Sequence, residues 1–157
     1  MRTGIGYDSH RFIEGRPLML GGIEIPHDKG LDGHSDADAL IHAIIDAILG
    51  ALGAGDIGKL FPDNDPAYLD AKSTDLLKRI MQMVHAEGFE VTWVDTTVIC
   101  EAPRIGMHVP AMRKALENTG LKHVNIKGKS NEGMGFLGRG EGIACMAVAT
   151  LKHVRQG

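Results

Sequence analysis

Three residues in the first third of the chain, Asp8, His10 and His42, have side chains that bind metal ions. Asp8 and His10 are two positions apart, and His42 lies in a segment with helical hydrophobic spacing. One carboxylate and two imidazoles would give a zinc ion three ligands and leave its fourth position open, as in catalytic zinc sites. Because an Asp-x-His triplet also arises by chance, the surrounding residues must decide whether a metal binds here.

Carboxylates surround His42 in the sequence. The segment His34-Ser35-Asp36-Ala37-Asp38 precedes it, and Asp46 follows it by one helical turn. Asp38, His42 and Asp46 are four positions apart, so on a helix they form one polar stripe. A lone helical His is usually solvated or hydrogen bonded for structural reasons, but a carboxylate one turn away can fix the tautomer of a metal-binding His. We therefore expect these carboxylates to orient His42.

The composition predicts one globular domain, residues 1–157. Hydrophobic residues make up 43% of the 157 residues and charged residues 24%, as in ordinary globular proteins. The net charge of -3 gives no overall attraction to nucleic acid or to anionic membranes, so we expect neither as a partner. An anionic ligand must instead be held locally by a metal, by helix ends or by a few Lys and Arg side chains.

The two cysteines and the N-terminus indicate a cytoplasmic protein. Cys100 and Cys145 lie far apart among apolar neighbours, which favours buried free thiols over a disulfide or a Cys-based zinc site. We find no signal peptide and no apolar run of membrane length.

Hydrophobic spacing predicts alternating strands and helices. Strands are expected over residues 2–8, 18–25, 90–100 and 124–127, and helices over 35–52, 73–87 and 110–120. The apolar run over residues 142–154 suits either a strand or a helix, and we favour a strand. The first strand should end in a turn at Asp8-Ser9-His10, and Gly21-Gly22 should mark a bulge or a tight backbone approach in the second. Ser35 is the expected N-cap of the first helix, with Asp38 as its capping-box partner.

This alternation predicts a two-layer α/β (α+β) sandwich, in which helices cover one face of a mixed sheet of four to five strands. The other sheet face would then be apolar and exposed. Burial of this face in an oligomer is the expected solution, because exposed apolar surfaces of this kind promote association.

A glycine-rich segment, residues 133–138, matches G-x-G-x-x-G. We reject a dinucleotide-binding motif, because too little chain follows Gly138 for the required helix and acidic residue. A glycine turn between two strands is the general alternative. However, Lys129-Ser130-Asn131-Glu132 precedes the segment and Arg139 follows it, and this mixture of hydroxyl, carboxylate and cation suits a phosphate group with a divalent metal.

Two further polar segments, residues 56–65 and 101–106, follow a predicted helix and a predicted strand. Either is interpreted most simply as a connecting loop. Because loops at strand ends commonly bind ligands, both are also candidate substrate-binding segments.

Together these segments resemble the 2-C-methyl-D-erythritol 2,4-cyclodiphosphate synthase family of the non-mevalonate isoprenoid pathway. The matching sequences are GYDSH at 6–10, GHSDAD at 33–38, DIGKLFPD at 56–63 and GFLGRGEGI at 135–143. The resemblance spans essentially the whole chain. It does not include the cytidylyltransferase domain that bifunctional members carry.

The resemblance implies a homotrimer with active sites between subunits and zinc on Asp8, His10 and His42. The implied substrate is 4-diphosphocytidyl-2-C-methyl-D-erythritol 2-phosphate, whose 2-phosphate attacks the β-phosphorus and releases CMP, so the enzyme would be a lyase. Glu132 would help to bind Mg²⁺ or Mn²⁺ on the diphosphate, and His34 and Ser130 would stabilise the transition state.

The resemblance also implies a set of substrate contacts. These are Asp8, Ser9, His10, His34, Ser35, Asp56, Ile57, Gly58, Phe61, Pro62, Asp63, Asn64, Asp65, Cys100, Glu101, Ala102, Pro103, Arg104, Ile105, Gly106, Lys129, Ser130, Asn131, Glu132, Phe136 and Arg139. Residues 56–58 and 61–65 would hold the methylerythritol part, and residues 100–106 would line the cytidine pocket. Phe136 and Arg139 would face the trimer axis, where some members hold an isoprenoid diphosphate.

One segment departs from the family pattern. Many members have a run of threonines before the glutamate, whereas this chain has Lys129-Ser130-Asn131. Ser130 keeps a hydroxyl at the position that we equate with the catalytic threonine. Two alternatives to the synthase activity are a zinc-dependent phosphohydrolase, which would activate water, and a noncatalytic trimer that binds metal and isoprenoid diphosphate.

Overall fold

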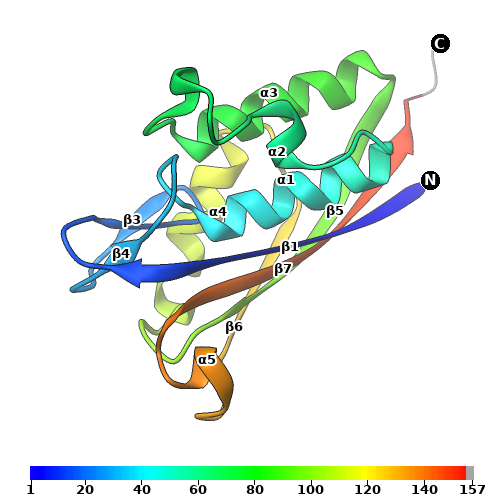
Figure 1. Cartoon of the computed structure of the whole chain (residues 1–157). Helices are drawn as coiled ribbons and strands as arrows, with labels where there is room; N and C mark the ends of the chain where they lie inside the picture. Colours follow the sequence, from blue (N-terminus) through cyan, green and yellow to red (C-terminus); the bar gives the residue numbers. More distant parts are fainter. Residues whose placement is uncertain (155–157) are drawn as a thin grey trace.

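The computed structural model describes residues 1–154, whose centre is a five-stranded mixed sheet (Figure 1). The strand order is β4-β1-β7-β5-β6. The strands are β1 (Arg2–Ile13), β4 (Gly30–Leu31), β5 (Phe89–Ile99), β6 (Val124–Lys129) and β7 (Gly142–His153). Only the β5–β6 pairing in this sheet is parallel. A separate hairpin consists of β2 (Leu18–Leu20) and β3 (Ile23–Ile25).

Three helices cover one face of the sheet, as Figure 1 shows. They are α1 (Ala39–Leu52), α3 (Ser73–Ala86) and α4 (Val109–Glu117). Shorter helical segments are α2 (Ile57–Leu60), α5 (Gly135–Gly138) and the 3₁₀ turns Pro66–Tyr68 and Gly106–His108. The predicted two-layer architecture is therefore confirmed.

Helix α1 packs directly on β1, because the strand has glycines where the two backbones meet. A Cβ atom added to Gly4 or Gly6 would overlap the carbonyl oxygen of Ala47 or Ala43, respectively. The isoleucines of α1 are buried and complete the core against the inward residues of β5 and β7. The close approach places the start of α1 beside the middle of β1.

The opposite face of the sheet is apolar and uncovered in the single chain. Ile5 and Tyr7 of β1 are 77% and 53% exposed, and Met146 and Val148 of β7 are 51% and 42% exposed. Ile5 pairs with Val148 and Tyr7 with Met146, so the four side chains form one patch, which we call the apolar sheet face. Contiguous exposed apolar side chains of this kind favour the expectation that another protein surface covers them.

Two strand predictions were wrong in their boundaries. β1 does not end at Asp8 but continues to Ile13, because residues 8–11 pair with β7 and the last two residues pair with β4. Residues 18–25 form a hairpin and not one bulged strand, because Gly21 and Gly22 have φ values of 62° and 80° and form the two-residue turn between β2 and β3.

The predicted N-cap of the first helix was also wrong. The cap is Asp38 and not Ser35: its carboxylate accepts a hydrogen bond from the Ile41 backbone N–H at 3.0 Å. The same carboxylate accepts from the backbone N–H groups of Gly21 and Gly22, at 2.9 and 2.7 Å. Burial and the nearby Asp36 charge raise the pKa of Asp38. One buried carboxylate thus joins α1 to the β2–β3 hairpin.

Two segments that were predicted as loops contain short helices. Residues 56–65 include α2, whose N-cap Asp56 accepts from the Lys59 backbone N–H at 2.9 Å. The glycine-rich segment includes α5. The predictions for α3, α4, β5, β6 and β7 are confirmed to within a few residues at each end.

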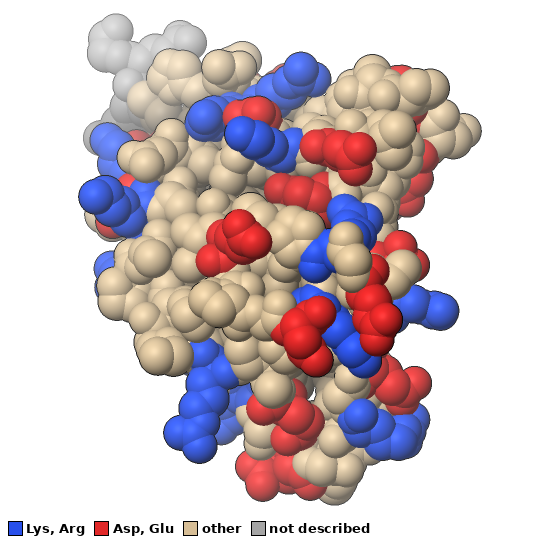
Figure 2. All heavy atoms as spheres, turned by 90° about the vertical axis from the view of Figure 1, so that its left-hand side faces the viewer, with Lys and Arg blue, Asp and Glu red and all other residues tan. Residues whose placement is uncertain are grey.

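Two properties of the surface bear on possible partners. In the part of the chain that the structure describes, no helix is long and apolar enough to cross a membrane. On the face shown in Figure 2, acidic and basic side chains are interspersed.

We predict that Gly6→Ala destabilises the fold by about 1–3 kcal/mol, because the added methyl group forces α1 away from β1. Urea unfolding followed by circular dichroism measures the change. Gly106→Ala is the matched control, because a Cβ atom there meets no heavy atom within 4 Å. Equal stability of Gly6→Ala and the unmodified chain would contradict the close packing described above.

Candidate metal centre and neighbouring pockets

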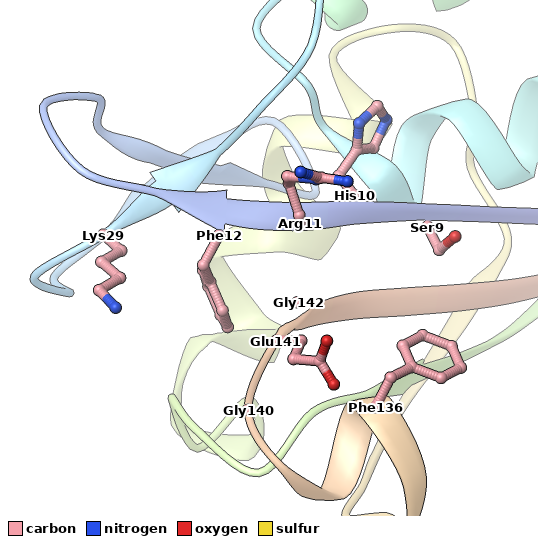
Figure 3. Close-up of a pocket in the computed structure, with 9 residues that line it drawn as sticks. All are labelled: Ser9, His10, Arg11, Phe12, Lys29, Phe136, Gly140, Glu141 and Gly142. Carbon is pink, nitrogen blue, oxygen red and sulfur yellow. The ribbon is translucent and has the colours of Figure 1, made fainter.

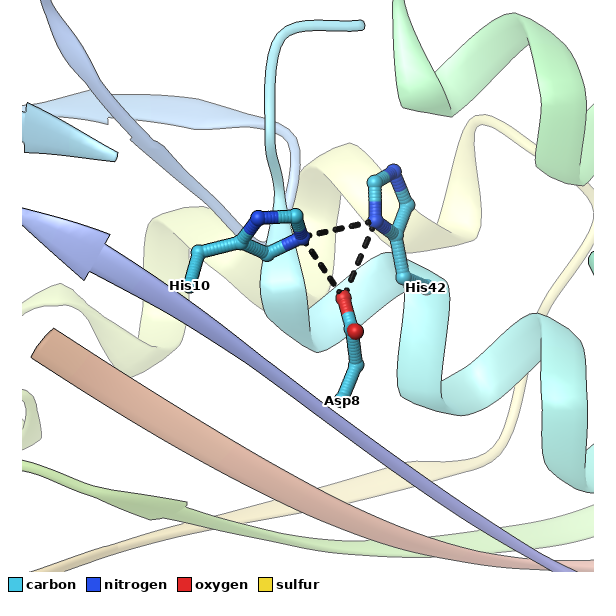
Figure 4. A group of neighbouring side chains, drawn as sticks. All are labelled: Asp8, His10 and His42. Carbon is cyan, nitrogen blue, oxygen red and sulfur yellow. Dashed lines mark hydrogen bonds and ion pairs between the residues drawn. The ribbon is translucent and has the colours of Figure 1, made fainter. Parts of the chain in front are cut away.

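Asp8, His10 and His42 converge on one point (Figure 4). One ligand atom from each residue lies within 4.8 Å of the others. Asp8 Oδ2 is 2.8 Å from His10 Nε2 and 3.0 Å from His42 Nδ1, and the two ring nitrogens are 3.3 Å apart. The sequence prediction that these residues form one cluster is confirmed.

The fold explains why these side chains meet. Residues two apart on a strand point to the same face, so Asp8 and His10 lie on the side of Gly4 and Gly6, toward α1. His42 precedes Ala43, which contacts β1 at Gly6. The glycine contact that brings α1 onto β1 therefore also brings His42 to Asp8.

Hydrogen bonds occupy the outer nitrogen of each imidazole ring. His10 Nδ1 donates to the Asp32 carbonyl oxygen at 2.7 Å. His42 Nε2 lies 2.9 Å from Ser73 Oγ and 3.2 Å from Ser35 Oγ. Each ring is thus fixed by one nitrogen while the other points into the cluster, as in metal sites with supporting hydrogen bonds.

The expectation that Asp38 and Asp46 orient His42 was wrong. The Asp38 carboxylate is engaged with backbone N–H groups at the start of α1 and in the β2–β3 turn. Asp46 accepts from the Ile57 backbone N–H at 2.8 Å and so fixes α2. The serine hydroxyls come from segments that helical spacing around His42 does not reveal.

The electrostatics of the cluster suit a cation. Burial disfavours the charged form of Asp8, but hydrogen bonds and charge interactions with His10 and His42 outweigh it and lower the pKa of Asp8 to about 2. Burial similarly opposes protonation of His10, yet the Asp8 carboxylate raises the pKa of His10. A carboxylate that is ionised at neutral pH and two imidazoles match the ligand set of a zinc ion with an open position.

A pocket of about 160 Å³ adjoins the cluster. Its lining residues are Asp8, His10, Gly33, His34, Ser35, His42, Ile57, Gly58, Phe61, Asp63, Tyr68 and Leu76. The sequence analysis did not name Gly33, Tyr68 or Leu76 as site residues. Tyr68 packs edge-on against Phe61, with ring centroids 5.2 Å apart. The positions of Phe61 and Tyr68 in the sequence do not by themselves predict this contact.

Polar contacts hold the segment that carries His34 and Ser35 at this pocket. Arg16 donates to the carbonyl oxygens of Gly33 and Ser35, both at 2.6 Å. His34 Nε2 donates to the Asp65 carbonyl oxygen at 3.1 Å. The sequence analysis missed Arg16, because no local sequence pattern links it to residues 17 and 19 positions away.

A second pocket, of about 380 Å³, lies at the ends of β5 and β6. Its lining residues are Cys100, Glu101, Pro103, Arg104, Ile105, Gly106, Gly128, Lys129 and Ser130. Glu101 Oε1 accepts from the backbone N–H groups of Asn131 and Gly133, at 2.9 and 3.3 Å. Ser130 Oγ donates to Glu132 Oε1 at 3.0 Å. The structure thus joins the predicted cytidine segment to the Ser130–Glu132 segment.

The first and second pockets share no lining residue. Predicted site residues therefore line two separate pockets, one at the Asp8 cluster and one at Ser130. Ser9 and Phe136 line neither of these two pockets. The metal cluster and Ser130 do not line a common pocket among these two.

A third pocket, of about 660 Å³, lies between the end of β1 and α5 (Figure 3). Ser9 lines this pocket and not the one at the metal cluster, because strand alternation directs it away from Asp8 and His10. Phe136 reaches the pocket from α5. Arg139 Nη2 forms an ion pair with Glu141 Oε2 at 2.8 Å.

Comparison with known proteins identifies the family. A sequence model described as the YgbB family matches residues 1–152. The chain belongs to the YgbB family. It is 54% identical to a 2-C-methyl-D-erythritol 2,4-cyclodiphosphate synthase of Syntrophus aciditrophicus (strain SB), over 98% of both chains.

Solved structures agree with this assignment to the YgbB family. The bifunctional IspDF from Campylobacter jejuni superposes with a TM-score of 0.91 at 41% identity, and the match covers 97% of this chain but 42% of the bifunctional one. A 2C-methyl-D-erythritol-2,4-cyclodiphosphate synthase described as a CDP-bound form has a TM-score of 0.87 at 36% identity, with 96% of this chain and 100% of that chain covered.

Both cysteines of this YgbB-family chain are free and buried, as predicted. Burial and the Glu101 charge raise the pKa of Cys100 to about 11, and burial raises the pKa of Cys145 well above its usual value.

We therefore predict that the folded chain reacts slowly with Ellman's reagent near pH 8. The rate should increase as the pH approaches the pKa of the Cys100 thiol. Guanidinium should release both thiols at once. Rapid labelling of the folded chain would contradict this burial.

Proposed function

We propose that this YgbB-family chain acts as a single-domain cyclodiphosphate synthase on 4-diphosphocytidyl-2-C-methyl-D-erythritol 2-phosphate. An oxygen of the 2-phosphate bonds to the β-phosphorus, and the bond from the β-phosphorus to the bridging oxygen breaks. CMP leaves with that oxygen, and 2-C-methyl-D-erythritol 2,4-cyclodiphosphate remains. No water enters, so the reaction is a phosphorus-oxygen lyase reaction of non-mevalonate isoprenoid biosynthesis.

The observation that carries this proposal is the convergence of Asp8, His10 and His42 at the wall of a pocket. A phosphoryl centre attacked by an anionic phosphate requires charge neutralisation and alignment more than a strong base. Zinc held by these three residues would act as a Lewis acid toward a β-phosphate oxygen. The names of the curated relative and of the solved structures support the same reaction.

The residues of the chain itself bind and orient the substrate. His34 lies beside the cluster, where its imidazole would hydrogen bond to the reacting phosphates. The Ser130 hydroxyl donates a hydrogen bond to Glu132 in this structure. It would turn to the diphosphate when Glu132 binds Mg²⁺ or Mn²⁺. Lys129 adds a cation at the same pocket.

The two pockets fit two parts of one substrate. The pocket at Ile57, Gly58 and Phe61 would hold the methylerythritol part, with Asp63 accepting from its hydroxyl groups. The Cys100–Gly106 segment would hold cytidine through backbone groups that read the base edge. The solved relative described as a CDP-bound form supports a nucleotide ligand of this kind.

A homotrimer would unite these two pockets. In one chain the two pockets have no lining residue in common, and in a trimer the metal cluster of one subunit would lie beside the Ser130 pocket of its neighbour. The apolar sheet face supplies the surface that such an assembly would bury. Phe136 and Arg139 would face the trimer axis, where Arg139 would exchange Glu141 for the diphosphate of an isoprenoid.

We predict that the purified chain, given this substrate with zinc and Mg²⁺, releases CMP and cyclic diphosphate in equal amounts. Phosphorus NMR and chromatography measure both products. His42→Ala, which removes one of the three ligands, should lose stoichiometric zinc and turnover while keeping its circular dichroism spectrum. Linear phosphate products would instead identify a phosphohydrolase, and ligand binding without turnover would identify a noncatalytic binder.

Ser130→Ala should lower kcat by about 100- to 1,000-fold, because a hydrogen bond that stabilises the transition state is lost. Ser130→Thr keeps the hydroxyl and should retain most of the activity. Steady-state kinetics on the two variants provide the comparison. The assigned role of Ser130 is refuted when Ser130→Ala is as active as the unmodified chain.

A further inference from the structure

Ser73, the first residue of α3, is fully buried between His42 and Asp36. Its Oγ lies 2.9 Å from His42 Nε2 and 2.5 Å from Asp36 Oδ1. The hydroxyl does not cap its own helix: the N-cap position of α3 is Lys72, without a side-chain hydrogen bond. A buried polar group with no role in its own helix needs another explanation.

The hydrogen-bonding capacity of these groups determines the direction of each bond. A serine hydroxyl has one hydrogen to donate, whereas an ionised carboxylate only accepts. The hydroxyl hydrogen of Ser73 therefore goes to Asp36, whose other oxygen accepts from the Ser73 backbone N–H at 3.0 Å. Ser73 Oγ is left with lone pairs, so it must accept the Nε2–H of His42.

This assignment fixes the tautomer of His42. With the proton on Nε2, the lone pair of Nδ1 points to Asp8 Oδ2 and to His10 Nε2. His10 has the mirrored arrangement, because its Nδ1–H donates to the Asp32 carbonyl. Three lone pairs thus face one another within 4.8 Å with no hydrogen between them when both rings are neutral. Such an arrangement is unfavourable until a cation lies at its centre.

Asp36 is itself held firmly in place. Its backbone N–H donates to the Ala71 carbonyl at 3.1 Å, and the Asp70 backbone N–H donates to the His34 carbonyl at 2.9 Å. These bonds tie the His34–Asp36 segment to the start of α3. Asp36 and Ser73 are therefore rigid relative to each other, as an orienting pair must be.

We propose that Asp36 and Ser73 are positioning residues that hold His42 in its Nε2–H tautomer and so present Nδ1 to the metal ion. This inference rests on the metal role in the proposed function and assigns the orienting task to a hydroxyl relayed to a carboxylate. Ser35 Oγ, at 3.2 Å from His42 Nε2, is the weaker second contact.

The test is the zinc affinity of Ser73→Ala, measured by competition with a chromophoric chelator at fixed pH. Removal of the acceptor of Nε2–H should weaken zinc binding by roughly 10- to 100-fold, the range for the loss of a ligand-supporting hydrogen bond. Thr74→Val, which removes a hydroxyl from the adjacent residue, should bind zinc like the unmodified chain. A folded Ser73→Ala with unchanged zinc affinity overturns the proposal.

A second measurement needs no substitution. In the zinc-loaded, ¹⁵N-histidine-labelled chain, NMR should show a hydrogen on Nε2 of His42 and metal coordination at Nδ1. A hydrogen on Nδ1 overturns the proposal even when Ser73→Ala does not fold. Failure of the unmodified chain to bind zinc would instead reject the metal role itself, so the two failures are distinguishable.

Discussion

The contact between the backbones of α1 and β1 determines where the three candidate zinc ligands lie. Glycine at positions 4 and 6 leaves no Cβ atom between strand and helix, so the carbonyl groups of Ala43 and Ala47 lie against the strand. Asp8 and His10 lie on the same face of β1 as these glycines, and His42 lies in the first turn of α1, facing β1. A bulkier strand would move the helix outward and separate His42 from Asp8.

Hydrogen bonds that originate outside α1 and β1 then fix the two histidines of the metal cluster. The Asp32 carbonyl holds His10, and the Ser73 hydroxyl holds His42. Arg16 holds the segment on which His34 is presented. Because these partners are distant in sequence, the geometry of the site depends on the complete fold.

The sequence predicted the elements that follow short-range periodicity and, from the types of the ligand residues, the Asp8, His10 and His42 cluster. It missed the hydrogen-bond partners that orient these ligands from distant segments. Alternation and helical spacing were sufficient for α3, α4, β5, β7 and the layer architecture. Helical spacing also suggested Asp38 and Asp46 as partners of His42, yet each binds backbone N–H groups elsewhere. Ser73 is 31 positions from His42, so no local pattern reveals that contact.

The metal cluster and Ser130 line two pockets that have no lining residue in common, and the metal cluster is complete within one chain. The central claim is that Asp8, His10 and His42 bind zinc. Zinc X-ray absorption on the purified chain tests this claim most directly. The account predicts one zinc per chain with two imidazole nitrogens and otherwise oxygen ligands. Sulfur ligands, or an absence of imidazole scattering, would contradict it.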